Sequence, residues 1–183
     1  MEDDTSFNIA LWPDDESLLQ ECIRLAQLNC SEIADQYLIG DHACPHVTLC
    51  QINAETDELE NIWAAIQSVH PKQLSLSFNQ FYIKPGQNEL EGYYWVGVGV
   101  RRAAEIINLQ KTIYDQLLSL NLESRNKPLG YTPHLTWARC KGDSPQPIKY
   151  FPSNEFWSKS YTFSLSLGRS DKHGVYHERL FSL

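Results

Sequence analysis

The chain contains no apolar segment that approaches the roughly 20 residues needed to cross a lipid bilayer. Residues 1–4 (MEDD) are acidic where a secretory signal is basic, and no apolar stretch follows them. Basic clusters are also lacking, since the largest is the pair Arg101-Arg102, and the net charge is −8. We therefore expect a cytoplasmic protein without a membrane partner, and a ligand smaller than a long nucleic-acid duplex.

Cysteine is sparse and irregularly placed, with 5 residues that show no disulfide-type spacing. In a chain without an export signal, reduced thiols are the expected state. The chain does contain 42% hydrophobic and 21% charged residues in a length of 183. This composition is typical of one globular domain. We expect a single domain over residues 1–183 and a monomer.

The periodicity of apolar residues predicts an α+β fold. Strands are expected at residues 8–12, 46–52, 73–82, 93–100, 134–139, 160–167 and 175–183. Helices are expected after the N-cap Asp14, after Thr56 and across residues 103–120. Because the strand–helix–strand order occurs twice, we expect a bilobal fold. Two pseudo-symmetric lobes, from residues 1–84 and 89–183, would each place an antiparallel-rich sheet and flanking helices around a central cleft.

The pattern Pro-His-x-Thr occurs once in each half. It reads Pro45-His46-Val47-Thr48 in the first half and Pro133-His134-Leu135-Thr136 in the second. Chance would supply about 0.01 copies in a chain of this composition. The distance from the opening strand to the motif histidine is also similar, 46 − 7 = 39 residues and 134 − 93 = 41 residues. The repetition therefore indicates a role shared by the two copies.

The spacing within each motif indicates a catalytic site. Residues i and i+2 of a strand project from the same face, so each strand presents one imidazole and one hydroxyl. In-line displacement at phosphorus requires a base on one side and an acid on the other, and histidine serves either role because its pKa lies near 6.5. Threonine hydroxyls can donate hydrogen bonds to the non-bridging oxygens. We expect His46, His134, Thr48 and Thr136 to be catalytic, with both threonines also binding substrate, and no cofactor.

Paired Pro-His-apolar-Thr-apolar motifs resemble those of the two-histidine (2H) phosphoesterase superfamily, which includes bacterial 2′-5′ RNA ligase-like proteins and cyclic phosphodiesterases. The resemblance covers nearly the whole chain, from the opening strand with Trp12-Pro13-Asp14 to the closing strand. It implies a bilobal fold with a central cleft and metal-independent hydrolysis at the four motif residues. It further implies that His134 activates water and that His46 protonates the leaving oxygen.

Three residues near the motifs have weaker assignments. Tyr131 precedes the second motif and could stack on a base or ribose, although a role as a loop anchor is equally consistent with its position. Arg139 follows the second motif as a candidate substrate ligand, but strict alternation places it on the face opposite His134 unless the strand bulges. Cys50 would share the face of His46 as a small packing residue.

We interpret the chain as a phosphodiesterase for a small cyclic phosphodiester of the nucleoside 2′,3′-cyclic phosphate type. Cleavage of 2′-5′-linked oligonucleotides and 2′-5′ ligation of RNA ends use the same chemistry and remain open, so an RNA end is a further candidate substrate. A non-catalytic nucleotide-binding protein is a second class. A third is a zinc hydrolase, since His42, Cys44 and His46 stand at alternate positions.

Overall fold

The computed structural model describes residues 5–40, 43–69, 73–142 and 144–183. The strands are β1 (Ser6–Pro13), β2 (Ala34–Leu38), β3 (Val47–Asn53), β4 (Leu74–Leu76), β5 (Phe78–Pro85), β6 (Tyr93–Val100), β7 (His134–Lys141), β8 (Tyr161–Ser170) and β9 (Tyr176–Ser182). The helices are α1 (Glu16–Cys30), α2 (Leu59–Gln67), α3 (Ala104–Ser119) and α4 (Asn154–Ser158), with short 3₁₀ turns η1 (Thr56–Glu58) and η2 (Asn88–Leu90). The predicted α+β class is confirmed.

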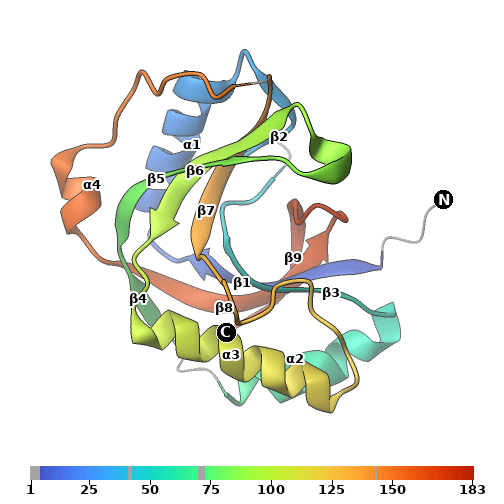
Figure 1. The fold of residues 1–183 in the computed structure, drawn as a ribbon. Helices are drawn as coiled ribbons and strands as arrows, with labels where there is room; N and C mark the ends of the chain where they lie inside the picture. Colours follow the sequence, from blue (N-terminus) through green and yellow to red (C-terminus); the bar gives the residue numbers. More distant parts are fainter. Residues whose placement is uncertain (1–4, 41–42, 70–72, 143) are drawn as a thin grey trace.

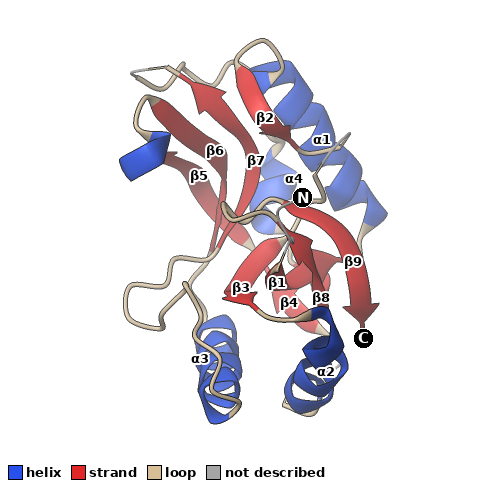
Figure 2. Ribbon diagram, turned by 90° about the vertical axis from the view of Figure 1, so that its right-hand side faces the viewer, coloured by secondary structure: helices blue, strands red, loops and turns tan. Residues whose placement is uncertain are grey.

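The named strands pair antiparallel in the order β4-β8-β1-β3-β7-β6-β5, with β9 beside β8 and β2 beside β7. β3 and β7 meet through the single pair Val47↔Leu135. This junction separates a first strand group (β1, β3, β4, β8, β9) from a second strand group (β2, β5, β6, β7), as Figure 2 shows. Helix α1 packs against β7, whereas α3 packs against β3 (Figure 1).

The two strand groups do not coincide with residues 1–84 and 89–183. β1 from the start of the chain pairs with β8 from near its end, and β5 pairs with β6 across the boundary near residue 84. The physical reason is the β5–β6 hairpin, in which a short connection through Asn88–Leu90 holds the two strands together. Each strand group is therefore built from both parts of the chain.

Several element boundaries differ from the sequence prediction. The N-cap of α1 is Asp15, whose carboxylate accepts from the backbone N–H groups of Ser17 and Leu18. Asp14 instead extends the pairing of β1 with β8, since its N–H donates to the Thr162 carbonyl and its carboxylate accepts from the Ser164 hydroxyl. The expected strand at residues 73–82 is divided into β4 and β5, which pair with β8 and β6 respectively. Strand β2 and helix α4 were not predicted, because their segments are polar or rich in proline.

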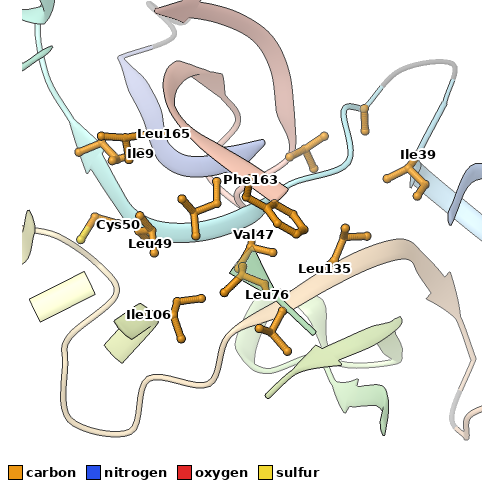
Figure 3. Close-up of a cluster of buried hydrophobic side chains, with 14 of the residues drawn as sticks. Ile9, Ile39, Val47, Leu49, Cys50, Leu76, Ile106, Leu135, Phe163 and Leu165 are labelled. Carbon is orange, nitrogen blue, oxygen red and sulfur yellow. The ribbon is translucent and has the colours of Figure 1, made fainter. Parts of the chain in front are cut away.

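The core lies between the strands and their helices, and its centre is the junction of the two motif strands. Val47 and Leu135 are both 0% exposed and pack with Leu49, Ile106 and other apolar side chains (Figure 3). Val47 and Leu135 are the x residues of the two Pro-His-x-Thr motifs, and Leu49 directly follows the first motif. Packing of the x residues therefore fixes the two strands against each other and positions the flanking histidines and threonines. No helix in the described ranges is both long enough and apolar enough to span a membrane.

Gly97 on β6 allows a close approach of β7. A Cβ at this position would lie 2.1 Å from the Leu135 carbonyl oxygen, which belongs to the backbone and cannot rotate away. At Gly99 the nearest atom is the Gln80 side chain at 3.0 Å, which can move. We expect Gly97→Ala to lower the free energy of unfolding by about 2–3 kcal/mol and Gly99→Ala by clearly less, measured by urea denaturation. Equal losses would contradict the close approach.

Candidate active site

A cleft of about 290 Å³ opens between the two strand groups and contains all four motif residues, His46, Thr48, His134 and Thr136. Continuing the antiparallel register of Val47↔Leu135 places His46 across from Thr136 and Thr48 across from His134. The two motif strands thus present both imidazoles to one cleft. The cleft is further lined by Tyr37, Gln51, Tyr82, Lys84, Pro85, Gly86, Gln87, Leu90, Trp95, Asn126, His173 and Gly174.

The two imidazoles make equivalent hydrogen bonds to the backbone. Nδ1 of His46 lies 2.8 Å from the Cys44 carbonyl oxygen, and Nδ1 of His134 lies 2.8 Å from the Thr132 carbonyl oxygen. In each case the acceptor is the residue before the motif proline. Because a carbonyl can only accept, each Nδ1 carries a hydrogen, and the remaining nitrogen Nε2 is the one available for proton transfer.

The surroundings of the two rings differ. His46 is 5% exposed and packs 5.0 Å from the Tyr176 ring centroid. His134 is half-buried and stacks on Tyr82, with ring centroids 3.8 Å apart and planes inclined by 6°. Burial lowers the pKa of His46 to about 4, with a smaller contribution from the nearby charge of His134. Burial also lowers the pKa of His134, and repulsion by the Lys84 ammonium acts in the same direction. Both imidazoles are therefore stabilised in the neutral form.

The backbone carbonyl of each motif threonine accepts a hydrogen bond from a tyrosine hydroxyl. Tyr131 donates its hydroxyl to the Thr48 carbonyl at 2.8 Å, and Tyr37 donates to the Thr136 carbonyl at 3.3 Å. Tyr131 is 6% exposed and does not line the cleft, so it anchors the motif strand instead of presenting its ring to a substrate. The stacking role considered for Tyr131 is corrected on this ground. Tyr37 was not foreseen, because it lies in the polar segment where no strand was predicted.

The tyrosine contacts yield a matched pair of variants. We expect Tyr131→Phe to lower the free energy of unfolding by about 1–2 kcal/mol, because it removes a short, partly buried hydrogen bond. Tyr37→Phe should cost less, since its bond to Thr136 is longer. Chemical denaturation of the two proteins measures the difference. A larger loss in Tyr37→Phe would show that hydrogen-bond length does not rank these two anchors.

Both motif strands bulge directly after the threonine. On β3, Thr48 pairs with Ala10 and Cys50 with Ile9, so Leu49 is the extra residue. On β7, Thr136 pairs with Gly97 and Ala138 with Val96, so Trp137 is the extra residue. A bulge reverses the alternation of the residues that follow it. The face assignments made by strict alternation therefore fail beyond the motifs.

The first bulge exchanges the expected positions of Cys50 and Gln51. Cys50 is 0% exposed and lies in the core, whereas Gln51 lines the cleft. The prediction that Cys50 shares the face of His46 is wrong for this reason. Gln51 was missed because its polarity alone is typical of many exposed strand positions.

The second bulge brings Arg139 beside aromatic residues of β6. The guanidinium lies 5.8 Å from the ring centroid of Trp95, which lines the cleft, and 2.9 Å from Oε1 of Gln36. Its Nη2 is also 3.4 Å from the Asp35 carboxylate. Arg139 is 4% exposed and does not itself line the cleft, so it supports the wall behind Trp95 in this structure.

The possible zinc ligands are placed only in part. His42 lies outside the described residues, so the alternative of His42, Cys44 and His46 is not tested as a set. The Cys44 sulfur lies 3.8 Å from the His177 carbonyl oxygen. Within the described ranges, no group of three His, Cys, Asp or Glu side chains is arranged to hold a metal ion.

The fold is shared with solved structures of phosphoesterases. The sequence itself matches no family model and no curated protein. E. coli LigT complexed with 3′-AMP aligns with 98% of this chain and 97% of its own at 16% identity and a TM-score of 0.65. A structure described as a phosphoesterase aligns with 98% and 97% of the two chains at 16% identity and a TM-score of 0.64. The MHV ns2 PDE domain aligns with 90% and 99% at 15% identity and a TM-score of 0.54. The resemblance to 2H phosphoesterases is thus confirmed at the level of the fold.

Proposed function

We propose that this protein hydrolyses a small cyclic phosphodiester of the nucleoside 2′,3′-cyclic phosphate type, with His46 and His134 as the acid–base pair and without a metal ion. The observation that carries the proposal is the convergence of both motifs on one cleft through the Val47↔Leu135 pair. Solved structures that share the fold support the proposal: two are described as a phosphoesterase and a PDE domain, and LigT was solved with bound 3′-AMP.

The reaction follows from the positions of the four motif residues. One imidazole takes a proton from water as the water oxygen forms a bond to phosphorus. The other imidazole gives its proton to the ribose oxygen as the bond from that oxygen to phosphorus breaks. The Thr48 and Thr136 hydroxyls donate hydrogen bonds to the non-bridging oxygens, where negative charge is held during the displacement. The product is a phosphate monoester, and the imidazole that began neutral ends protonated.

The size and charge of the site favour a small substrate. A cleft of about 290 Å³ is at the lower end of the range of small-molecule sites. The chain as a whole carries a net charge of −8, which opposes binding of a long polyanion. Lys84 supplies a local positive charge at the cleft beside His134. A single anionic phosphodiester fits this arrangement better than an extended strand.

A substrate panel tests the proposal. The purified protein is incubated with the four nucleoside 2′,3′-cyclic phosphates and with 2′-5′- and 3′-5′-linked dinucleotides, in the presence of EDTA, and products are identified by ³¹P NMR. We expect turnover of the cyclic phosphates that is insensitive to EDTA. Turnover of the 2′-5′ dinucleotides alone would assign the alternative substrate. Loss of activity in EDTA with recovery on addition of Zn²⁺ would refute the metal-independent mechanism, and no turnover of any substrate would favour a binding protein.

Lys84 provides a prediction about substrate binding. Because its ammonium is exposed at the cleft, Lys84→Gln should raise KM for an anionic substrate about tenfold and change kcat much less. Lys141→Gln makes the same change in net charge at an exposed residue that does not line the cleft. Steady-state kinetics at low ionic strength compare the two. Equal effects would show that net charge, and not the position of Lys84, governs binding.

A further inference from the structure

Two amide side chains, those of Gln51 and Asn126, line the cleft without a role in the proposed reaction. Gln51 follows Thr48 by three positions on β3 and reaches the cleft side because of the bulge at Leu49. At the usual rise of about 3.3 Å per residue, Thr48 and Gln51 are at most about 10 Å apart along the strand. A nucleoside whose phosphate is bound at Thr48 can span that distance with its base.

The segment that follows α3 lies beside β3 and carries Asn126. The Arg125 N–H donates to the Gln51 carbonyl oxygen at 2.9 Å. A side chain provides the next contact, since Asn126 Oδ1 accepts from the Gln51 N–H at 2.9 Å. The backbone carbonyl of Asn126 in turn accepts from Gln110 Nε2 at 3.0 Å. Gln51 and Asn126 are therefore in direct contact, and Asn126 is held in place from two sides.

Backbone groups fix the orientation of both amides. Gln51 Nε2 donates to the Asp171 carbonyl oxygen at 2.8 Å and to Ser6 Oγ at 3.2 Å. Because a carbonyl can only accept, the nitrogen of Gln51 must face Asp171, and Oε1 lies on the other side of the amide. Because a backbone N–H can only donate, Asn126 must present Oδ1 to Gln51 and direct Nδ2 elsewhere. Among the described residues, no hydrogen bond reaches Gln51 Oε1 or is donated by Asn126 Nδ2.

The two unused atoms belong to the cleft. Gln51 is only 7% exposed, and an acceptor with so little access to water is costly to leave unpaired. Gly174 also lines the cleft, and a Cβ at this position would lie 3.6 Å from Gln51 Oε1. The missing side chain of Gly174 therefore leaves Oε1 accessible to a ligand in the cleft. Asn126 offers the cleft Nδ2, so one acceptor and one donor are available there.

This combination of atoms selects the chemistry of the ligand. The non-bridging oxygens of a phosphodiester only accept hydrogen bonds and would be repelled by Gln51 Oε1. A nucleobase edge instead presents a donor beside an acceptor. Pro85 and Leu90 also line the cleft and provide apolar surface for the faces of a base. A few oriented polar groups beside apolar walls are usual in small-molecule sites.

We propose that Gln51 and Asn126 are specificity-determining residues that bind the edge of the nucleobase. Gln51 Oε1 accepts from an N–H of the base, and Asn126 Nδ2 donates to the acceptor beside it. This inference rests on the proposed function and adds the part of the substrate that the acid–base pair does not contact. Because every base has such an edge, the pair accepts all four bases and selects nucleosides over cyclic phosphates without a base.

Asn126→Asp converts the donor of the pair into a second acceptor. The substitution keeps the shape of the side chain and an oxygen for the Gln51 N–H, so the fold should survive. Two adjacent acceptors match two adjacent donors, which among the bases only guanine offers, at N1–H and its amino group. The ratio of kcat/KM for guanosine 2′,3′-cyclic phosphate to that for adenosine 2′,3′-cyclic phosphate should rise about tenfold or more. An unchanged ratio would overturn the inference.

Asn53→Asp is the matched control for added charge. Asn53 lies two residues beyond Gln51 at the end of β3, is exposed and does not line the cleft. Repulsion between a new carboxylate and the phosphodiester acts on all the nucleotides alike and cancels in the ratio. The ratio of guanosine to adenosine turnover should therefore keep its wild-type value in Asn53→Asp. An equal rise in both variants would assign the effect to charge instead of the Asn126 amide, and the inference would fail.

Methyl riboside 2,3-cyclic phosphate separates contacts to the base from contacts to the sugar. It retains the ribose and its 5′-hydroxyl, which can also donate and accept, but it has no base. In Asn126→Asp, kcat/KM for the adenosine substrate should fall about tenfold more than kcat/KM for the methyl riboside. Equal falls would place the contact at the sugar or the phosphate and would overturn the assignment to the base.

A binding measurement keeps this inference separate from the proposed function. Absence of turnover by the wild-type protein would refute the proposed function, and calorimetric titration with guanosine and adenosine 3′-monophosphates would then decide the role of the amides. Asn126→Asp should shift the ratio of the two affinities about tenfold toward guanosine. An unchanged ratio would overturn the inference, as would wild-type binding of both nucleotides no tighter than that of ribose 3-phosphate.

Discussion

Replacing either motif histidine with alanine should lower turnover of a nucleoside 2′,3′-cyclic phosphate by about a hundredfold or more. This is the usual effect of losing general acid or base assistance. Because the two imidazoles serve one displacement in the proposed mechanism, the His46→Ala/His134→Ala double variant should lose little more than the more impaired single variant. Single-turnover and steady-state rates of the three proteins provide the comparison.

The control for the histidine variants is His177→Ala, which makes the same change at an exposed histidine outside the cleft. Circular dichroism and a thermal unfolding curve establish that each variant is folded. Near-normal rates in both His46→Ala and His134→Ala would remove the acid–base pair from the account. Losses that multiply in the double variant would indicate that the two rings act in separate steps.

The kcat/KM for a cyclic phosphodiester should be greatest below pH 6.5 and should fall about tenfold per pH unit on the alkaline side. In the proposed mechanism the reactive form has one neutral and one protonated imidazole. Burial lowers the pKa of both rings in the free protein, that of His46 to about 4, so this form is abundant only between two values that lie below the ordinary 6.5. A phosphodiester keeps a single negative charge throughout, so the substrate adds no titration of its own.

The pH profile is measured from pH 4 to 9 at constant ionic strength. The Lys84→Gln variant provides a further comparison. Removal of the ammonium that opposes protonation of His134 should move the alkaline side of the profile to higher pH. A maximum above pH 7 in the wild-type protein would contradict the effect of burial on the two imidazoles.

The centre of the site could be predicted from sequence because the motif works through local geometry. An i, i+2 spacing on a strand fixes a common face, and an apolar x residue fixes which face is buried. Val47 and Leu135 fill that role and form the one pair that joins β3 to β7. Two copies of such a motif in one chain therefore predict where four side chains lie.

The surroundings of the site could not be predicted because they depend on departures from regular structure. The bulges at Leu49 and Trp137 have no distinctive sequence pattern, yet they place Gln51 at the cleft and turn Cys50 into the core. Tyr82 and Tyr37 reach the motifs from strands that are distant in sequence.

The composition of the two strand groups also could not be predicted from the sequence pattern. The repeated strand–helix–strand order suggested that each half of the chain folds upon itself. Instead α1 packs against β7 and α3 against β3, so each long helix covers a motif strand from the other half. Periodicity identifies which residues of a helix are buried, but not which strand they are buried against.

A structure of the protein with bound orthovanadate, a mimic of five-coordinate phosphorus, tests the account most directly. We expect the vanadium between the two motif strands, with Nε2 of residues 46 and 134 within hydrogen-bond distance of oxygens on its opposite sides. The hydroxyls of residues 48 and 136 should contact the equatorial oxygens. A vanadate that reaches only one of the imidazoles would contradict a displacement shared between them.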